Sequence, residues 1–308
     1  MELPFLDWLR TQLPTSPRIP LGIGDDAALL TQQTGKQTVV TTDMLMDGVD
    51  FILKDCGPFA AGRKALAVNL SDLAAMGAKP VAAFVSLCLP RTGDEHHDLK
   101  FAQQLIQGML PLAAEFDCAI AGGDTNAWSG PLAINVTAIG EVTAGKAWLR
   151  SGARAGDAIL VTGSFGRSIE GKHLTFTPRV SDARQLQEPN IEIHAAIDVS
   201  DGLSLDLSRI CSASGCGALL IIDRIPLSLE TANHCAGDFA AARRHALSDG
   251  EDFELILAVP PHEAERLLRD QPLAVPLTQI GHFTAEPGLT QQLPDGRRLP
   301  LQPRGYEH

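Results

Sequence analysis

The chain has 308 residues, of which 44% are apolar, so it is long enough for one large domain or two ordinary ones. Its formal net charge of −12 argues against a nucleic-acid-binding surface, which needs a basic footprint, but permits phosphate ligands bridged by metal ions. The sequence has no secretion signal, no apolar run long enough to span a bilayer and no CxxC pair among its six cysteines. These features predict a cytoplasmic protein with reduced thiols and no membrane contact.

The first half of the chain predicts a compact α+β unit. A segment with two glycines and two aspartates, Gly22-Ile-Gly-Asp-Asp26, is expected to run into an apolar strand within residues 21–30. Apolar periodicity predicts helices over 3–13, 58–76 and 94–116, and further strands over 37–45, 81–89, 118–121 and 131–142. Pro58 suits the first turn of the second helix, and Gly77 suits its end.

The second half predicts an α/β unit of its own. The composition of residues 143–156 places a domain boundary near Arg150, which divides the chain into residues 1–149 and 150–308. Beyond this boundary we expect strands over 157–163, 192–198, 218–223, 253–259 and 277–283, helices over 203–214 and from Pro261, two short helices within 228–246, and a hairpin around Asp295-Gly296.

The helix over 58–76 carries two polar residues in an apolar setting. Asn69 and Asp72 are three residues apart, so they share a face of the helix. A carboxylate in such a setting needs a partner that offsets its desolvation. Two explanations are equally supported for Asp72: it binds a metal ion, or it caps a neighbouring element or pairs with a distant arginine. Lys64, on the same helix, could reach a phosphate, but on an apolar helix it is expected to extend its amine to solvent.

The aspartates with the strongest motif context stand at the ends of predicted elements, where ligands bind. They are Asp25, Asp26, Asp43, Asp72, Asp124, Asp198 and Asp201. Such a set, with no matching set of Lys or Arg, would repel itself unless cations lie among its members. Oxygen-only ligands suit Mg²⁺, which bridges to phosphates. The pattern therefore predicts Mg²⁺-assisted chemistry on phosphates. Because the chain has no P-loop and no kinase glycine loop, a P-loop ATPase and a protein kinase are disfavoured.

Several motifs in a fixed order resemble the thiamine-monophosphate kinase family, within the superfamily of aminoimidazole ribonucleotide synthetase. The resemblance spans nearly the whole chain, down to the terminal Gly305-Tyr-Glu-His308. The motifs are Gly22-Ile-Gly-Asp-Asp-Ala-Ala-Leu-Leu30, Thr41-Thr-Asp43, Lys64-Ala-Leu-Ala-Val-Asn-Leu-Ser-Asp-Leu-Ala-Ala-Met-Gly-Ala78, Gly122-Gly-Asp-Thr125, Leu149-Arg-Ser-Gly-Ala153, Ile197-Asp-Val-Ser-Asp-Gly-Leu203 and Gly250-Glu-Asp-Phe-Glu-Leu255.

The resemblance implies an α+β, two-domain fold. Its N-terminal mixed α/β domain, residues 1–149, would bind ATP and several Mg²⁺ ions and pair in a homodimer. Its C-terminal α/β domain, residues 150–308, would complete the substrate site. The implied reaction is direct transfer of a phosphoryl group from ATP to thiamine phosphate, which yields thiamine diphosphate.

The resemblance also implies roles for individual residues, position by position. The implied metal ligands are Asp26, Thr41, Thr42, Asp43, Asp72, Asp124, Asp198 and Asp201. The implied nucleotide contacts are Gly123, Asp124, Arg150 and Ser200, the implied acceptor contacts are Asp50, Glu251 and Tyr306, and the implied catalytic set is Asp43, Asp72, Asp124 and Arg150. Asp25 is equally compatible with shaping a turn and with binding metal.

Three positions depart from the family pattern. Asp50 stands where the family usually has a histidine that meets the substrate, and Asp249-Gly250 replaces a common Gly-Gly. The segment 163–191 is short and lacks much of the helical stretch usual there, with Pro178-Arg179 as a candidate remnant. The sequence therefore leaves two alternatives open: another ATP-using enzyme of the superfamily, or a catalytically silent protein that holds nucleotide or thiamine phosphates.

Overall fold

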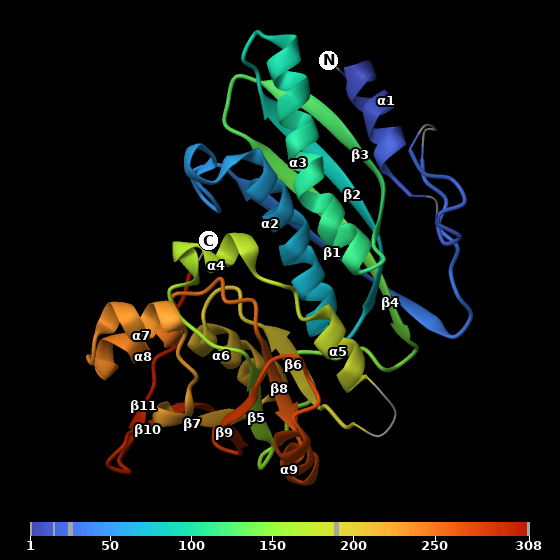
Figure 1. Ribbon diagram of the computed structural model, residues 1–308. Coiled ribbons are helices and arrows are strands. Elements are labelled where there is room, and N and C mark those ends of the chain that lie inside the picture. Colours follow the sequence, from blue (N-terminus) through green and yellow to red (C-terminus); the bar gives the residue numbers. More distant parts are fainter. Residues whose placement is uncertain (1, 15, 24–26, 188–190, 307–308) are drawn as a thin grey trace. The chain divides into compact units, whose positions relative to one another are not determined.

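The computed structural model describes residues 2–14, 16–23, 27–187 and 191–306 (Figure 1). Residue contacts divide the chain into two compact units. Unit 1 comprises Met1–Leu73 and Ala78–Lys146, and unit 2 comprises Ala74–Gly77 and Ala147–His308. Within the described ranges, no helix combines the length and the apolar character that a membrane crossing requires.

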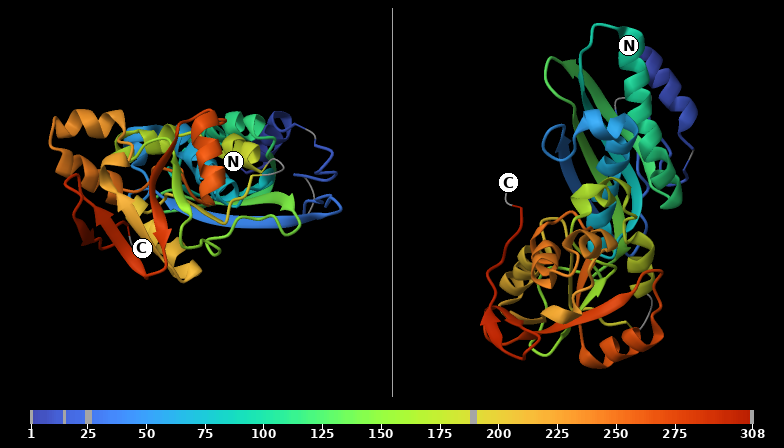
Figure 2. Two further views of the ribbon diagram at one scale, coloured as in Figure 1. Left: turned by 90° about the horizontal axis from the view of Figure 1, so that it is seen from below. Right: turned by 60° about the vertical axis from the view of Figure 1, so that its left-hand side comes forward.

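Unit 1 is built on a four-stranded sheet with helices on one face (Figures 1 and 2). Its strand order is β1-β4-β2-β3; β4 is antiparallel to both β1 and β2, whereas β2 and β3 are parallel. The elements are α1 (Glu2–Gln12), β1 (Lys36–Met46), α2 (Leu53–Ala75), β2 (Lys79–Pro90), α3 (Glu95–Glu115), β3 (Ala119–Trp128) and β4 (Ala133–Thr143). The predicted helices are thereby confirmed, and so are the strands near 37–45, 81–89 and 131–142.

Helix α2 is the centre of unit 1, and its predicted start is nearly right. The helix breaks at Gly57, whose φ of 75° is left-handed, and resumes at Pro58, where a missing N–H costs nothing. Asn69 is fully buried, and its Nδ2 donates to the carbonyl of Ala65 at 3.0 Å. Helix α3 begins as predicted, because the Asp94 carboxylate accepts from the N–H groups of His96 and His97.

Two strand predictions in unit 1 are wrong. Around residues 21–30, the described part forms an isolated bridge between Leu21 and Leu29 in place of a regular strand. The strand predicted over 118–121 continues to Trp128, because it pairs in parallel with β2 along its length. Gly123 therefore lies inside a strand, where an added Cβ would sit 1.8 Å from the carbonyl oxygen of Val85.

Unit 2 contains a seven-stranded sheet of order β11-β10-β7-β9-β5-β8-β6. Its strands are β5 (Ala158–Thr162), β6 (Ala195–Asp198), β7 (Gly217–Ile221), β8 (Leu255–Val259), β9 (Leu277–Thr284), β10 (Gly288–Gln292) and β11 (Arg298–Pro300). Its helices are η1 (Ser168–Glu170), α4 (Lys172–Thr175), α5 (Val180–Leu186), α6 (Leu203–Ser214), η2 (Ile222–Arg224), α7 (Leu229–Cys235), α8 (Phe239–Ser248) and α9 (Pro261–Asp270). All predicted elements of this half are present, and the described part of 163–191 is partly helical.

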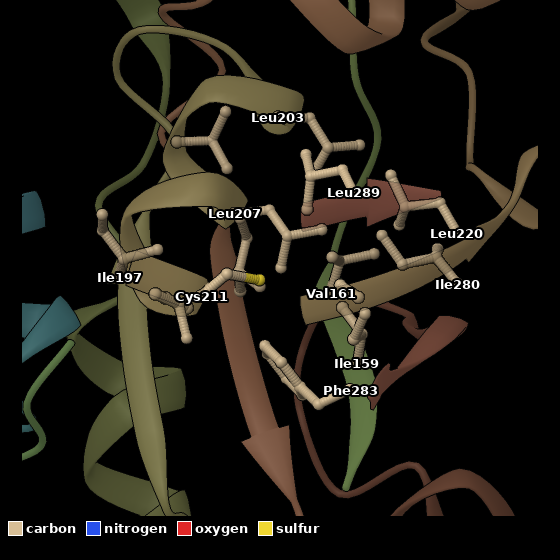
Figure 3. Close-up of a cluster of buried hydrophobic side chains, with 14 of the residues drawn as sticks. Ile159, Val161, Ile197, Leu203, Leu207, Cys211, Leu220, Ile280, Phe283 and Leu289 are labelled. Atoms are coloured by element: carbon tan, nitrogen blue, oxygen red, sulfur yellow. The ribbon is translucent and has the colours of Figure 1, made fainter. Parts of the chain in front are cut away.

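The core of unit 2 lies between α6 and the sheet. Figure 3 shows Leu203, Leu207 and Cys211 of α6 directed toward strand side chains that include Ile159 and Ile280. This packing follows from the sequence, since α6 repeats its apolar residues at helical spacing and the strands are almost continuously apolar. This core supports the end of β6 at Asp198 and the start of α6, and the loop between them carries Ser200 and Asp201.

Candidate active site

In unit 1 the structure brings together Asp43 of β1 and Asp72 of α2. The hydroxyl Oγ1 of Thr41 donates to Asp72 Oδ2 at 2.5 Å, which holds the carboxylate toward the sheet. Burial, followed by repulsion from Asp72 and Asp50, raises the pKa of Asp43 to about 7. The pair is therefore a partly buried site where negative charge accumulates and a cation is favoured.

Thr42 lies on the opposite face of β1 from Thr41 and Asp43, because side chains alternate along a strand. Its Oγ1 is 3.0 Å from Thr137 Oγ1 and accepts from Asn135 Nδ2, also at 3.0 Å. The structure thus does not bring the Thr42 hydroxyl to Asp72. Its predicted role as a metal ligand rests on the resemblance alone.

Asp50 lies in the turn between β1 and α2, close in sequence to Asp43. Its Oδ2 accepts from the backbone N–H of Met46 at 2.6 Å, so the carboxylate faces back toward the end of β1. The Nζ of Lys64 donates to the carbonyl oxygen of Asp50 at 2.5 Å, and the Lys64 side chain is only 1% exposed. The expectation that Lys64 extends to solvent is therefore wrong.

Gly123 and Asp124 of β3 line a cavity of about 820 Å³ inside unit 1. The Asp124 side chain is exposed, and its Oδ1 accepts from the N–H of Thr125 at 2.9 Å. The walls combine apolar, small and polar residues: Phe5, Leu6, Leu9, Ile23, Phe84 and Ile106; Gly22, Ala27 and Ala28; Arg10, Ser86 and Thr125. A cavity of this size, with apolar side chains, a few polar groups and glycine backbone at one side, suits a flat heterocycle with a polar tail.

The sequence did not predict that side chains of α1 and α3 would line this cavity. Leu6, Leu9 and Ile106 follow helical spacing, which predicts core packing and gives no sign of a cavity. The available signal was a set of small residues, since small side chains leave space for a ligand: Gly22, Ala27, Ala28, Ala121, Gly122 and Gly123.

In unit 2 two predicted residues, Glu251 and Tyr306, meet the loop after β6, which carries two others. The N–H of Glu251 donates to the carbonyl of Ser200 at 2.7 Å, and the N–H of Tyr306 donates to the carbonyl of Asp201 at 2.9 Å. Glu251 adopts a left-handed φ of 55°, unusual for a residue with a side chain. The structure therefore brings Ser200, Asp201, Glu251 and Tyr306 into one neighbourhood, next to the buried Asp198 at the end of β6.

Asp201 has a cationic partner that the sequence pattern did not reveal. The Arg209 guanidinium lies 2.5 Å from Asp201 Oδ2 and 2.5 Å from Asp206 Oδ1. Asp206 Oδ2 in turn accepts from the N–H groups of Asp201 and Gly202. For Asp201 the expectation of an unmatched carboxylate is therefore wrong, because one turn of α6 supplies the charge.

Three predicted residues remain: Arg150, Asp25 and Asp26. Arg150 lies in unit 2 with an exposed side chain, and its carbonyl accepts from Ser214 Oγ at 3.2 Å. Asp25 and Asp26 lie outside the described residues. Across the ranges that are described, no group of three or more His, Cys, Asp or Glu side chains is arranged to hold a metal ion.

Two residues of the motif over 250–255, Asp252 and Glu254, bind residues of the segment 163–187. Asp252 Oδ1 accepts from the N–H of Gly166 at 3.0 Å and from Ser168 Oγ at 2.5 Å. Glu254 is 1% exposed and accepts from Arg179 at 2.7 Å through each carboxylate oxygen. Burial alone would raise the pKa of Glu254, but hydrogen bonds and charge from Arg179 hold it below its ordinary value. Arg179, the candidate remnant, is therefore a structural anchor.

We expect Asp252 to make stability rise as pH falls from 8 to 5. Burial raises its pKa to about 7, so the native carboxyl takes up a proton in this window while the unfolded-state carboxyl stays ionised. Urea unfolding at several pH values should show a smaller rise for Asp252→Asn than for the unaltered protein. Asp270→Asn is the control, because Asp270 is exposed and Arg269 lowers its pKa. Equal pH slopes for Asp252→Asn and the unaltered protein would contradict this assignment.

Comparison with known proteins agrees with this architecture. Residues 24–142 match the family described as AIR synthase related protein, N-terminal domain, and residues 167–293 match the corresponding C-terminal domain. A thiamine-monophosphate kinase of Rhodopirellula baltica is 39% identical over 100% of this chain and 97% of its own length. That of Escherichia coli K12 is 37% identical over 94% of this chain and 92% of its own length.

Solved structures give the same result. The thiamine-monophosphate kinase of Stenotrophomonas maltophilia superimposes with a TM-score of 0.82 at 35% identity, covering 94% of this chain and 95% of that one. AaThiL complexed with AMPPCP and TMP superimposes with a TM-score of 0.77 at 27% identity, covering 100% of this chain and 96% of that one. The two matched domains define a protein of the AIR synthase related class, which confirms the predicted fold class. Within that class, the chain belongs to the thiamine-monophosphate kinase family.

Proposed function

We propose that this protein transfers a phosphoryl group from ATP to thiamine phosphate and so produces thiamine diphosphate. The observation that carries the proposal is identity of 39% to a thiamine-monophosphate kinase over 100% of this chain. The complex of AaThiL with AMPPCP, a methylene analogue of ATP, and TMP supports the same pair of substrates. Asp43 and Asp72 form a charged site of the kind that phosphoryl transfer requires.

Mg²⁺ is the proposed cofactor, and the donor set in unit 1 fits it. Asp43, Asp72 and Thr41 offer only oxygen donors, and repulsion between the carboxylates favours a cation beside them. These few protein ligands suit an ion that keeps several waters and also binds phosphates. When bound, Mg²⁺ would neutralise charge on the transferred phosphoryl group. We extend the proposed metal set to Asp26, Thr42, Asp124, Asp198 and Asp201 from the resemblance.

The cavity in unit 1 is the proposed nucleotide site. Its apolar side chains suit a purine ring, and Gly123 at its wall is the proposed nucleotide contact that the resemblance implies. Asp124 at the cavity wall would face the phosphates through a metal ion. In unit 2, Arg150 and Ser200 are the proposed further nucleotide contacts, since a guanidinium offers a forked donor to phosphate oxygens.

Asp50, Glu251 and Tyr306 are the proposed contacts to thiamine phosphate. An ionised Asp50 cannot donate a hydrogen bond and would repel a phosphate, so its proposed partner is the cationic thiazolium or the aminopyrimidine. Glu251 can accept from the aminopyrimidine, and the Tyr306 ring, which is exposed, can stack on a heterocycle. A less anionic acceptor than thiamine phosphate is the alternative that Asp50 keeps open.

An acceptor assay tests the proposed function. The purified protein is incubated with ATP, Mg²⁺ and either thiamine phosphate or thiamine, and products are separated by chromatography. We expect thiamine diphosphate from thiamine phosphate. If ATP and Mg²⁺ bind but neither acceptor is phosphorylated, the protein is a silent binding homologue or another ATP-using member of its class.

We also propose that residues 1–149 and residues 150–308 form two domains with different roles. The N-terminal part carries Asp43, Asp72 and the cavity, and would bind nucleotide and form the dimer. The C-terminal part carries Glu251 and Tyr306 and would complete the acceptor site. The proposed location is the cytoplasm.

A homodimer is expected because one face of the unit 1 sheet is open. Val40 and Met44 of β1 point away from α2 and are 60% and 63% exposed. Apolar side chains in a row on a sheet face mark an interaction surface, and a second copy is the partner that the resemblance implies. Light scattering at micromolar concentration should give the mass of two chains.

A matched pair of substitutions locates this interface. Met44→Glu places a charge on the open face and should yield monomers. Leu299→Glu, at an exposed apolar site of unit 2, should leave the dimer intact. A monomeric unaltered protein, or a dimer that survives Met44→Glu, would remove this face as the interface.

A further inference from the structure

Lys64 is a buried ammonium inside unit 1. It lies on α2 among alanines and leucines and is 1% exposed, although its apolar stem is long enough to reach solvent from many helix positions. Taking an ammonium out of water is costly unless strong acceptors receive its N–H groups. One such acceptor, at 2.5 Å, is the carbonyl oxygen of Asp50, 14 residues earlier in the chain.

The turn that receives Lys64 is already ordered by its own carboxylates. Asp47 Oδ1 accepts from the N–H of Leu53 at 2.8 Å, which begins α2. The N–H of Asp50 donates to the carbonyl of Met46 at 3.0 Å, and Asp50 Oδ2 accepts from the N–H of Met46 at 2.6 Å. The position of the Asp50 carboxylate therefore depends on the backbone at residue 50, which is the point that Lys64 holds.

We propose that Lys64 is a positioning residue for the acceptor: it holds the backbone of Asp50 so that the Asp50 carboxylate faces a cationic ring of the phosphate acceptor. This inference rests on the proposed function, in which Asp50 contacts thiamine phosphate. The bond goes to a backbone oxygen, so Lys64 supports this turn whichever side chain stands at position 50.

The test compares Lys64→Met with Lys54→Met. Methionine matches the length of the buried stem but removes the charge and the donors. Lys54 is an exposed lysine on the same helix, so its replacement controls for the chemistry of the change. Lys64→Met should raise KM for thiamine phosphate about tenfold to 100-fold, with KM for ATP unchanged, because the acceptor contact is misplaced. Lys54→Met should leave both constants unchanged.

A double substitution separates positioning from general damage. Asp50→Ala alone should raise KM for thiamine phosphate, and adding Lys64→Met should raise it by less than about twofold more. Calorimetric titration with thiamine phosphate should show the same pattern in Kd. Effects that multiply, or a KM for ATP that rises in parallel, would overturn the inference.

Lys64→Arg keeps the test decisive if Lys64→Met does not fold. The longer guanidinium must displace the turn, so KM for thiamine phosphate should rise in the unaltered background and stay constant in the Asp50→Ala background. Equal rises in both backgrounds would contradict the proposal. An unaltered protein that makes no thiamine diphosphate would instead refute the proposed function, which is a separate outcome.

Discussion

Asp72→Asn is expected to abolish most nucleotide turnover while leaving the fold intact. Asparagine keeps the size of the side chain and an oxygen that can accept from Thr41 Oγ1, but it removes one negative charge beside Asp43. Loss of a proposed Mg²⁺ ligand should lower kcat by on the order of 100-fold or more, since even indirect partners of metal ligands cost 10-fold to 100-fold. The measurement is Mg²⁺-dependent turnover of ATP, with circular dichroism as the check on folding.

Asp98→Asn is the matched control for this change. Asp98 is a buried carboxylate of the same unit and also accepts from a threonine hydroxyl, Thr92 Oγ1 at 2.5 Å, but it lies on α3 outside the proposed site. Its replacement should leave turnover unchanged. Near-normal turnover in a folded Asp72→Asn protein would remove Asp72 from the proposed metal site.

Arg179→Met is expected to produce the largest loss of stability. It leaves the buried Glu254 carboxylate with Lys172 Nζ at 3.1 Å and Thr162 Oγ1 at 2.8 Å, but without the paired N–H donors of the guanidinium. Breaking a buried ion pair from one side costs about 3–5 kcal/mol, because the remaining charge stays buried. Urea unfolding should show this decrease in the free energy of unfolding.

Arg184→Met provides the comparison on the same helix. Arg184 is an exposed residue of α5, so its loss should change the free energy of unfolding by less than about 0.5 kcal/mol. If the two substitutions destabilise equally, the Glu254 pair does not anchor the segment 163–187. Because Glu251 belongs to the same motif, Arg179→Met should also raise KM for thiamine phosphate in protein that remains folded.

The sequence predicted most elements because their periodicity is local. Helix α3 carries its own cap at Asp94, and strands β5 and β8 of unit 2 are apolar along their length. The extent of β3 could not be predicted this way, because Gly122 and Gly123 disfavour a strand and pairing with β2 overrides that preference. The strand expected within 21–30 failed for a different reason. Ala28 and Leu30 pack against side chains of β2 and β3, and the described residues near them line the cavity instead of pairing as a regular strand.

The sequence named site candidates that motifs carry, but it did not reveal partners that come from elsewhere in the chain. Asp43 and Asp72 come from two separate motifs, and their proximity, with Thr41 Oγ1 bonded to Asp72, is visible only in the structure. The burial of Lys64 depends on the carbonyl of Asp50, which no helical pattern reveals. The ion pair between Arg209 and Asp201 likewise depends on the direction in which α6 continues from the loop that carries Asp201. Tertiary contacts decide all such partners.

Transfer of labelled phosphate tests the central claim most directly. The protein is mixed with thiamine phosphate, Mg²⁺ and ATP that carries ³²P in its γ-phosphoryl group, and the products are separated. Direct transfer predicts that the label appears in thiamine diphosphate in proportion to the ADP formed. Label found only in inorganic phosphate, with thiamine phosphate unchanged, would contradict the proposed kinase activity.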